Sequence, residues 1–298
     1  MKSIIFLLLL AFSLMSCNYQ EAVTLQGGSA VSFLRAFSSE EVDEVVLSPD
    51  LVDADYFEVI LSKIVVSVGL GSSYGESVFD TLVDYNEYYQ LTKTGNAEVL
   101  NARKSLYKYF KVTNPDSFSS TNGKLAFYIN AYNFFTLETV LLNFNEGRLK
   151  SITDIGGRGS FRAFTKIFHE VSGKKLSLDQ IENEVVRPMV NFADGRIHFA
   201  LICASIGCPI LLEKAYREDQ LDEQLDLATR KGLLLSRILS INGNSILLGQ
   251  IFNWFADDFI NDEGSVKAFL KKYLPANAPA FPANIDYIEY DWLLNASR

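Results

Sequence analysis

The chain has 298 residues, with 36 acidic and 27 basic side chains and a formal net charge of -9 at pH 7. Such a charge excludes a protein that tracks nucleic-acid phosphates, because that function requires a basic face. A hydrophobic content of 48% with 13% aromatic residues is sufficient for a hydrophobic core, and the length suits one large domain or two small ones.

The N-terminal sequence MKSIIFLLLLAFSLMSCNYQ is typical of a secretory signal peptide. Its apolar run is about 11 residues long, whereas a membrane-spanning helix needs about 20. The ending LMSC resembles a bacterial lipobox, in which the cysteine is acylated and becomes the mature N-terminus. We therefore expect a signal peptide over residues 1–16, a lipid anchor on Cys17 and a flexible tether over 17–38, at a membrane surface facing the periplasm or exterior. The alternative is a cleaved signal peptide that leaves a spare thiol.

The first part of the mature chain predicts helices. Residues 39–71 carry apolar side chains at helical spacing, and Ser48-Pro49 divides them into two helices. Two further helices are expected over 76–92 and 97–112.

The segment 120–145 predicts a long helix with Thr121 or Asn122 as its N-cap. The helix is apolar nearly all round, so the side chains of Asn130 and Asn133 are expected to be buried. A buried amide without a partner costs about 1 to 3 kcal/mol. These two amides therefore either tie the backbone of a nearby loop or orient a catalytic histidine.

Beyond residue 150 the pattern alternates between loops, strands and helices. A glycine-rich loop and a hairpin are expected first, and then Ser177 and Gln180 have the spacing of a capping box for a helix that ends at Pro188. The remaining predicted elements are a strand over 196–202, a helix from 215 or 217 to 235, a hairpin over 238–248 that turns at Asn242-Gly243, helices over 249–260 and 264–273, and a strand over 285–290. This mixture predicts a single α+β domain over 39–298.

The stretch RIHFALICASIGCPILLEKAYR, residues 196–217, holds one of the two histidines and two of the three cysteines. If 196–202 is a strand, His198 points into a sheltered pocket. We expect the carboxylate of Glu182, in the preceding helix, beside it. Cys208 precedes a proline at a predicted helix start, where the helix dipole lowers the pKa of a thiol.

Four interpretations of the two cysteines remain open. In one, Cys208 or Cys203 is a catalytic nucleophile and His198 its base, which requires neither metal nor cofactor, and we predict none. In another, the cysteines form a local disulfide, which export permits. In a third, they are metal ligands together with His198 and a recruited His169, although the spacing is not a recognised zinc pattern. In the fourth, both are inert core residues.

Several motifs in order resemble the domain of unknown function family numbered 547: KLAFYINAYNFFTLETV, DIGG, SLDQIE followed by VRP, RIHFALICASIGCP, IFNWFADDF and IEYDWLLN. The family occurs in bacterial lipoproteins, exported proteins and plant proteins, and has no established reaction. The resemblance covers about residues 80–295. It implies a fold similar to papain-like and transglutaminase-like cysteine peptidases, with a helical subdomain packed on a small antiparallel sheet.

Two features depart from these patterns. In papain-like peptidases the nucleophilic cysteine starts a helix and precedes the histidine, whereas His198 comes first here. The family pattern often has histidine after IE, where this chain has Asn183. That difference removes a possible second proton carrier.

The residues and the resemblance together predict a thiol-dependent hydrolase or acyl transferase that acts on peptide or isopeptide bonds, with Asn130 or Asn133 orienting His198. The alternative is a non-catalytic envelope module that binds a peptide or glycan through aromatic side chains. The candidate aromatic residues are Tyr128, Tyr132 and Trp254.

Overall fold

The computed structural model describes residues 37, 39–47, 53–242 and 244–297, and the statements below concern these residues. The chain divides into two units, and Phe33–Arg298 is the unit that contains all of them. The predicted signal peptide, Cys17, nearly all of the tether and the turn residue Gly243 lie outside the described residues.

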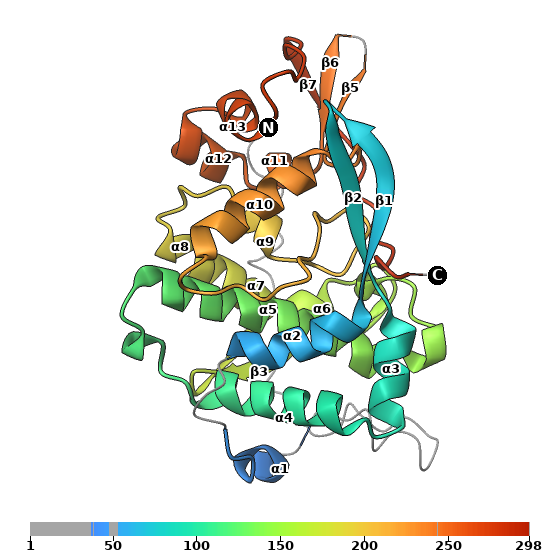
Figure 1. Ribbon diagram of the computed structural model, residues 1–298, viewed down its shortest axis with the longest axis vertical. Helices are drawn as coiled ribbons and strands as arrows, with labels where there is room; N and C mark the ends of the chain where they lie inside the picture. The colour runs from blue at the N-terminus through green and yellow to red at the C-terminus, as the bar shows by residue number, and fades with distance from the viewer. Residues whose placement is uncertain (1–36, 38, 48–52, 243, 298) are drawn as a thin grey trace. The chain divides into compact units, whose positions relative to one another are not determined.

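Helices make up most of the regular structure (Figure 1). The α-helices are α1 (Ser39–Asp43), α2 (Asp53–Ile64), α3 (Tyr85–Lys93), α4 (Ala97–Val112), α5 (Thr121–Asn143), α6 (Arg162–Thr165), α7 (Leu178–Gln180), α8 (Arg187–Met189), α9 (Ile197–Ala200), α10 (Leu221–Leu233), α11 (Ile251–Trp254), α12 (Ala256–Glu263) and α13 (Val266–Tyr273). Three 3₁₀ turns, η2 (Pro115–Ser117), η3 (Asn145–Gly147) and η4 (Ile152–Asp154), and a π-helix, η5 (Ile181–Val186), complete the set.

The described strands form three separate small sheets. Their bounds are β1 (Val65–Ser73), β2 (Glu76–Val83), β3 (Phe168–Val171), β4 (Lys174–Ser177), β5 (Leu239–Asn242), β6 (Ser245–Leu248) and β7 (Asn284–Tyr287). Strands β1 and β2 pair antiparallel, as do β3 with β4 and β5 with β6, whereas β7 runs parallel to β6. The predicted α+β class is confirmed, with three sheets in place of one.

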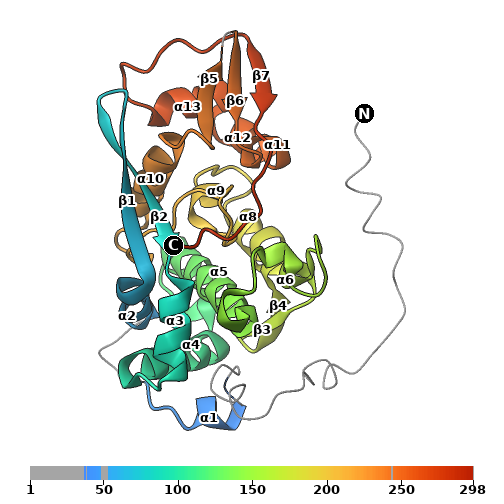
Figure 2. The same ribbon diagram turned by 90° about the vertical axis from the view of Figure 1, so that its right-hand side faces the viewer.

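Helix α5 is the central helix of the core, with helices on several sides of it (Figure 2). Its N-cap is Ser120, whose side chain accepts a hydrogen bond from the N–H of Gly123, one residue before the predicted caps. Its side chains are buried almost without interruption from Leu125 to Leu141. Because α5 has no solvent face along this length, its polar side chains must find partners inside the protein.

Two segments predicted as helix are strands instead. Residues 65–71 and 76–83 pair with each other as the β1–β2 ribbon, which turns at Tyr74 and Gly75 with positive φ angles of 52° and 80°. Both segments are rich in β-branched residues, which fit a pleated surface. The spacing of their apolar side chains also fits a helix. The two segments are strands because they pair with each other along the ribbon, beginning with Val65 opposite Val83.

A fully buried ion pair joins α4 to α5. Nε and Nη2 of Arg103 lie 2.9 and 2.6 Å from the two carboxylate oxygens of Glu138, and the hydroxyls of Tyr88 and Tyr107 donate to the same carboxylate. Both charged side chains are 0% exposed. Loss of either partner would leave an uncompensated charge in the core.

The C-terminal segment, residues 288–297, runs from the third sheet back to the core (Figure 2). The N–H of Ile288 donates to the carbonyl of Leu248, and further along the segment forms isolated bridges to three distant parts of the chain. The bridged pairs are Ser151–Leu293, Ser205–Leu294 and Val83–Ala296. The segment therefore brings together the loop after α5, strand β2 and the loop of residues 201–209, which holds Cys203 and Cys208 and which we call the cysteine loop.

Candidate functional site

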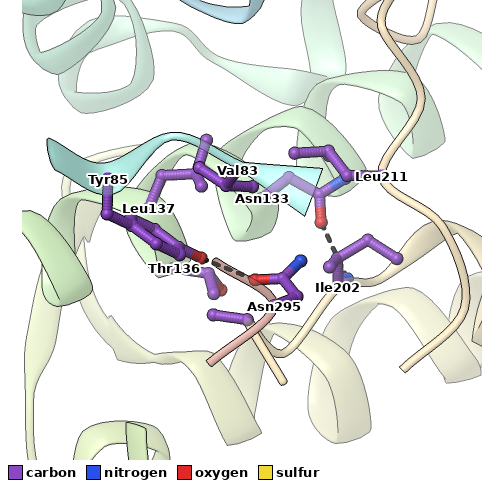
Figure 3. A pocket seen from close by; sticks show the side chains of 9 residues that line it. Val83, Tyr85, Asn133, Thr136, Leu137, Ile202, Leu211 and Asn295 are labelled. Atoms are coloured by element: carbon purple, nitrogen blue, oxygen red, sulfur yellow. Dashed lines mark hydrogen bonds between the residues drawn. The ribbon is translucent and has the colours of Figure 1, made fainter. Parts of the chain in front are cut away.

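His198 lies on the short helix α9, so the predicted strand over 196–202 is wrong. All four residues of α9 are buried. Alternation of polar and apolar side chains identifies a strand only when one face is exposed, so it is not informative in a fully buried segment. The backbone of residues 200–202 is hydrogen-bonded to a side chain of α5, whereas a strand would be bonded to the backbone of a neighbouring strand. The amide oxygen of Asn133 accepts a hydrogen bond from the N–H of Ile202 (Figure 3). The amide nitrogen of Asn133 donates to the carbonyl of Ala200.

The imidazole of His198 is hydrogen-bonded to the carboxylate of Asp258, a partner that the sequence analysis did not predict. Its Nε2 lies 2.9 Å from Oδ2 of Asp258, on α12, and its ring stacks on Phe255 with centroids 4.0 Å apart. Arg187 donates to both oxygens of Asp258, at 2.7 and 2.8 Å. Burial raises the pKa of Asp258, but the hydrogen bonds from Arg187 and His198 outweigh it and lower that pKa to about 2.

Glu182 lies beside His198, as predicted. Its Oε1 is 3.8 Å from Nδ1 of His198, and that nitrogen is buried without a hydrogen-bond partner. Glu182 belongs to the π-helix η5, and π turns are frequent at functional sites. The structure thus places His198 between two carboxylates, bonded to Asp258 and close to Glu182.

The two cysteines are joined in a Cys203–Cys208 disulfide. The helix predicted to start at Cys208 is absent, because the described chain has no helix between α9 and α10, and no helix dipole acts on that sulfur. Of the four interpretations of the pair, the structure has the local disulfide across the turn.

Neither ring nitrogen of His198 is hydrogen-bonded to a sulfur. Nε2 is taken by Asp258, and Nδ1 has no hydrogen-bond partner. The sulfurs have other neighbours: the hydroxyl of Tyr290 lies 2.7 Å from Sγ of Cys203 and 3.1 Å from Sγ of Cys208. The pairing of thiolate with imidazole that nucleophilic catalysis requires is not formed in this state.

The two asparagines of α5 bind backbone and not the histidine. Asn130 donates to the carbonyl of Tyr216 and to Asp53, and accepts from the N–H of Tyr216. Asn133 makes the equivalent pair of bonds with the chain on either side of Leu201. Burial raises the pKa of Asp53 to about 6, against the opposing hydrogen bond from Asn130. Of the two roles considered for these amides, the structure shows the tying of loops to the core.

Beside Asn133 lies a narrow gap lined by nine residues, which come from β2, α3, α5, the chain between residues 202 and 211 and the C-terminal segment (Figure 3). The gap leaves no room for a water molecule. The hydroxyl of Tyr85 crosses it to bond Asn295 at 2.9 Å. This gap is a packing interstice and not a binding site.

A much larger cleft of about 700 Å³, which we call the aromatic cleft, opens between residues 150–159 and 289–293. It is lined by Lys150, Ser151, Thr153, Asp154, Arg158, Gly159, Glu289, Tyr290, Asp291, Trp292 and Leu293. Tyr290 and Trp292 belong to a group of contacting rings that includes Phe161 and Trp254, which are 50% and 41% exposed. Tyr290 thus reaches from the wall of the cleft to the disulfide.

Sequence reasoning missed Asp258, Arg187 and Tyr290. Asp258 is 60 residues from His198, and Tyr290 is 87 residues from Cys203, so no local spacing reveals either contact. The motifs IFNWFADDF and IEYDWLLN, which contributed to the family resemblance, contain Asp258 and Tyr290 and were the available signal.

His169, the other histidine, lies on β3 and stacks on Phe135 with centroids 4.4 Å apart. Burial lowers its pKa to about 3. Among the described residues, no group of three or more His, Cys, Asp or Glu side chains is arranged to hold a metal ion. In the same part of the chain, no helix has the length and apolar character needed to cross a membrane.

Residues 115–231 match a family model described as "Protein of unknown function, DUF547". The match supports the family resemblance seen in the motifs, and it includes α5, Glu182, His198 and both cysteines. Asp258 and Tyr290 lie beyond it. No curated protein and no solved structure matches the chain.

Proposed function

We propose that the protein is a binding module of the bacterial cell envelope that holds a peptide in the aromatic cleft. The observation that carries the proposal is a cleft of about 700 Å³ that holds free charges of both signs and the half-buried rings of Tyr290 and Trp292, which contact the exposed ring of Trp254. Clefts of this volume are typical of ligand sites.

The charges of the cleft favour a peptide. Arg158 makes no side-chain hydrogen bond or ion pair within the described chain, and the same holds for Asp154 and Glu289. A peptide offers ammonium and carboxylate groups to such side chains, and charge-assisted hydrogen bonds are stronger than neutral ones. A neutral glycan would leave these charges without partners.

The aromatic rings supply an apolar contact next to the charges. Trp254 stacks on Trp292 with centroids 5.9 Å apart, and Trp254 is partly open to solvent. Exposed aromatic residues are frequent anchors in peptide recognition. Of the three aromatic candidates, Tyr132 is 3% exposed and belongs to the core, Tyr128 is half-buried, and Trp254 is available.

Thiol-dependent hydrolysis remains the second candidate from the sequence. It requires reduction of Cys203–Cys208 and a movement that brings a sulfur to His198, since that imidazole is bonded to Asp258. The papain-like fold also remains a proposal, because the order of histidine and cysteines differs from that class. The peptide-binding proposal requires no such rearrangement.

We further propose that several acyl chains on Cys17 anchor the module to the membrane, facing the periplasm or exterior. The support is the N-terminal sequence, with its short apolar run and LMSC ending. In that location the aromatic cleft meets peptides of the envelope.

Tryptophan fluorescence tests the binding proposal directly, because the chain has two tryptophans and both belong to the aromatic group at the cleft. We expect a synthetic peptide that contains lysine, glutamate and leucine to shift the emission in a saturable way. Arg158→Ala should weaken its binding about 10-fold, the effect of losing one hydrogen bond to a charged group. The matched control is Arg230→Ala, which removes an exposed arginine of α10.

Neutral oligosaccharides serve as the competing ligand class in the same titration. If an oligosaccharide binds as well as the peptide and Arg158→Ala changes neither affinity, the peptide assignment is wrong. If no ligand of either class changes the emission, the cleft is not a binding site.

A further inference from the structure

The surroundings of the Cys203–Cys208 disulfide consist of hydrogen-bond donors aimed at sulfur. The N–H of Cys203 lies 3.0 Å from Sγ of Cys208 and the hydroxyl of Tyr290 lies 3.1 Å from the same atom. Ser205 donates to the oxygen of Tyr290 at 2.9 Å, which leaves the single proton of Tyr290 free for a sulfur. The same hydroxyl lies 2.7 Å from Sγ of Cys203, and Oγ of Ser205 lies 3.0 Å from that sulfur. Tyr290 therefore serves both sulfurs, and Sγ of Cys208 has the N–H of Cys203 as a further donor.

This arrangement is built by residues distant in sequence. A side chain at Gly207 would place its Cβ 2.9 Å from the ring of Tyr290, so the glycine is what allows that ring to reach the sulfurs. Arg237, paired with Asp80, donates to the carbonyl of Cys208 at 3.0 Å and fixes that end of the loop. The donors are thus held in place before any reaction.

The two cysteine residues differ in exposure. Cys208 is 3% exposed, whereas Cys203 is half-buried. An external thiolate would reach Cys203 first, and the bond would break toward Cys208, where the donors stabilise a negative charge. Hydrogen bonds to a thiolate lower the pKa of the thiol and make it a better leaving group.

From these contacts we infer that Cys203–Cys208 is a reactive site for thiol–disulfide exchange with a small thiol or a cysteine-containing protein, and not only a structural link. A thiolate attacks Sγ of Cys203, a new S–S bond forms, and the electron pair of the old bond remains on Sγ of Cys208. A second thiolate attacks the mixed disulfide and releases the external disulfide and the Cys203 thiolate. Two thiols are oxidised, and the protein disulfide takes up two electrons and two protons.

The inference goes beyond the peptide-binding proposal and does not depend on it, since Tyr290 would contact the sulfurs whether or not the aromatic cleft binds a ligand. In the reverse reaction the reduced protein converts an external disulfide into two thiols, and Cys203 and Cys208 are oxidised to their disulfide. The external partner is defined here only by its sulfur chemistry.

The test incubates the folded protein, isolated without reductant, with glutathione and its disulfide at a series of ratios. Maleimide labelling followed by mass spectrometry then reports the reduced fraction of Cys203 and Cys208. We expect reduction of the folded protein, and oxidation of the reduced protein by glutathione disulfide. Tyr290→Phe should slow reduction at least 5-fold and shift the pH midpoint of thiol alkylation upward.

Tyr287→Phe, an exposed tyrosine on β7, is the matched control and should behave as the unchanged protein. Ser205→Ala should show a smaller effect in the same direction, because Ser205 contacts Tyr290 and Sγ of Cys203, whereas the charge develops on Sγ of Cys208. The inference is overturned if glutathione reduces the disulfide only when the protein unfolds. It is equally overturned if Tyr290→Phe, shown to be folded by its thermal transition, leaves both the rate and the pH midpoint unchanged.

Discussion

At the scale of single residues, Asp258 connects three parts of the chain. It binds Arg187 through both carboxylate oxygens and His198 through one, and its side chain is 1% exposed. The side chain of Arg187 is 20% exposed, so the pair is largely removed from water. Such a group is stabilising only while all partners are present.

We predict that Asp258→Asn lowers the free energy of unfolding by about 2 to 4 kcal/mol at pH 7, because Arg187 then lacks a counter-charge. The effect depends on pH. The pKa of Asp258 is lowered to about 2 in the folded protein, so its ionisation stabilises the fold above the unfolded pKa of about 4, and this contribution is lost as the pH falls toward 2.

Urea unfolding of both proteins at pH 7, 5, 4 and 3 measures this. The difference between them should be constant from pH 7 to pH 5 and shrink by about 1 kcal/mol by pH 3. Arg230→Ala, in an exposed pair, should change stability by less than about 0.5 kcal/mol. A difference that grows as the pH falls would show that Asp258 is not the stabilised carboxylate.

At the scale of elements, the sequence predicted best those segments whose signals are local. Helix α4 has the predicted bounds of 97–112, and the capping box of Ser177 and Gln180 is present with both of its hydrogen bonds. The hairpin of β5 and β6 also lies within its predicted range, 238–248. In each case the deciding contacts are among neighbours in the sequence.

Two incorrect predictions have different causes. The β1–β2 ribbon is a hairpin whose turn at Tyr74 and Gly75 was not recognised in the sequence. The backbone after α9, in contrast, is held by Asn133 of α5, which is distant in the sequence. The candidate site divides in the same way. His198 and Glu182 were found from their neighbourhood, whereas Asp258 and Tyr290 come from the C-terminal third and meet the site only in the fold.

The capping box gives a prediction at this scale. Ser177→Ala removes the side chain that accepts from the N–H of Gln180, and should lower the free energy of unfolding by about 1 kcal/mol. Denaturant unfolding of the variant measures the loss. Ser72→Ala, at an end of β1, is the control and should stay within about 0.5 kcal/mol of the unchanged protein. Equal stability of the two variants would contradict the assigned role of the cap.

At the scale of the whole molecule, the C-terminal segment assembles the candidate site. It supplies Tyr290 and Trp292 to the aromatic cleft, and its bridges to Ser151 and Ser205 join the cleft to the cysteine loop. The cleft and the disulfide therefore share one wall, formed by Tyr290. The proposed binding and exchange reactions are distinct: Arg158→Ala should weaken the binding, and Tyr290→Phe should slow the exchange.

Two contacts decide between the functions considered: the disulfide between Cys203 and Cys208, which lies against Tyr290, and the hydrogen bond between His198 and Asp258. The most direct measurement treats the folded protein, isolated without reductant, with iodoacetamide from pH 5 to pH 9 and maps the products by mass spectrometry. We predict that the peptide containing Cys203 and Cys208 is recovered unlabelled as a disulfide at every pH, in the unchanged protein and in His198→Ala alike. Rapid labelling of either cysteine below pH 7 that disappears in His198→Ala would contradict the account and restore the thiolate–imidazole pair.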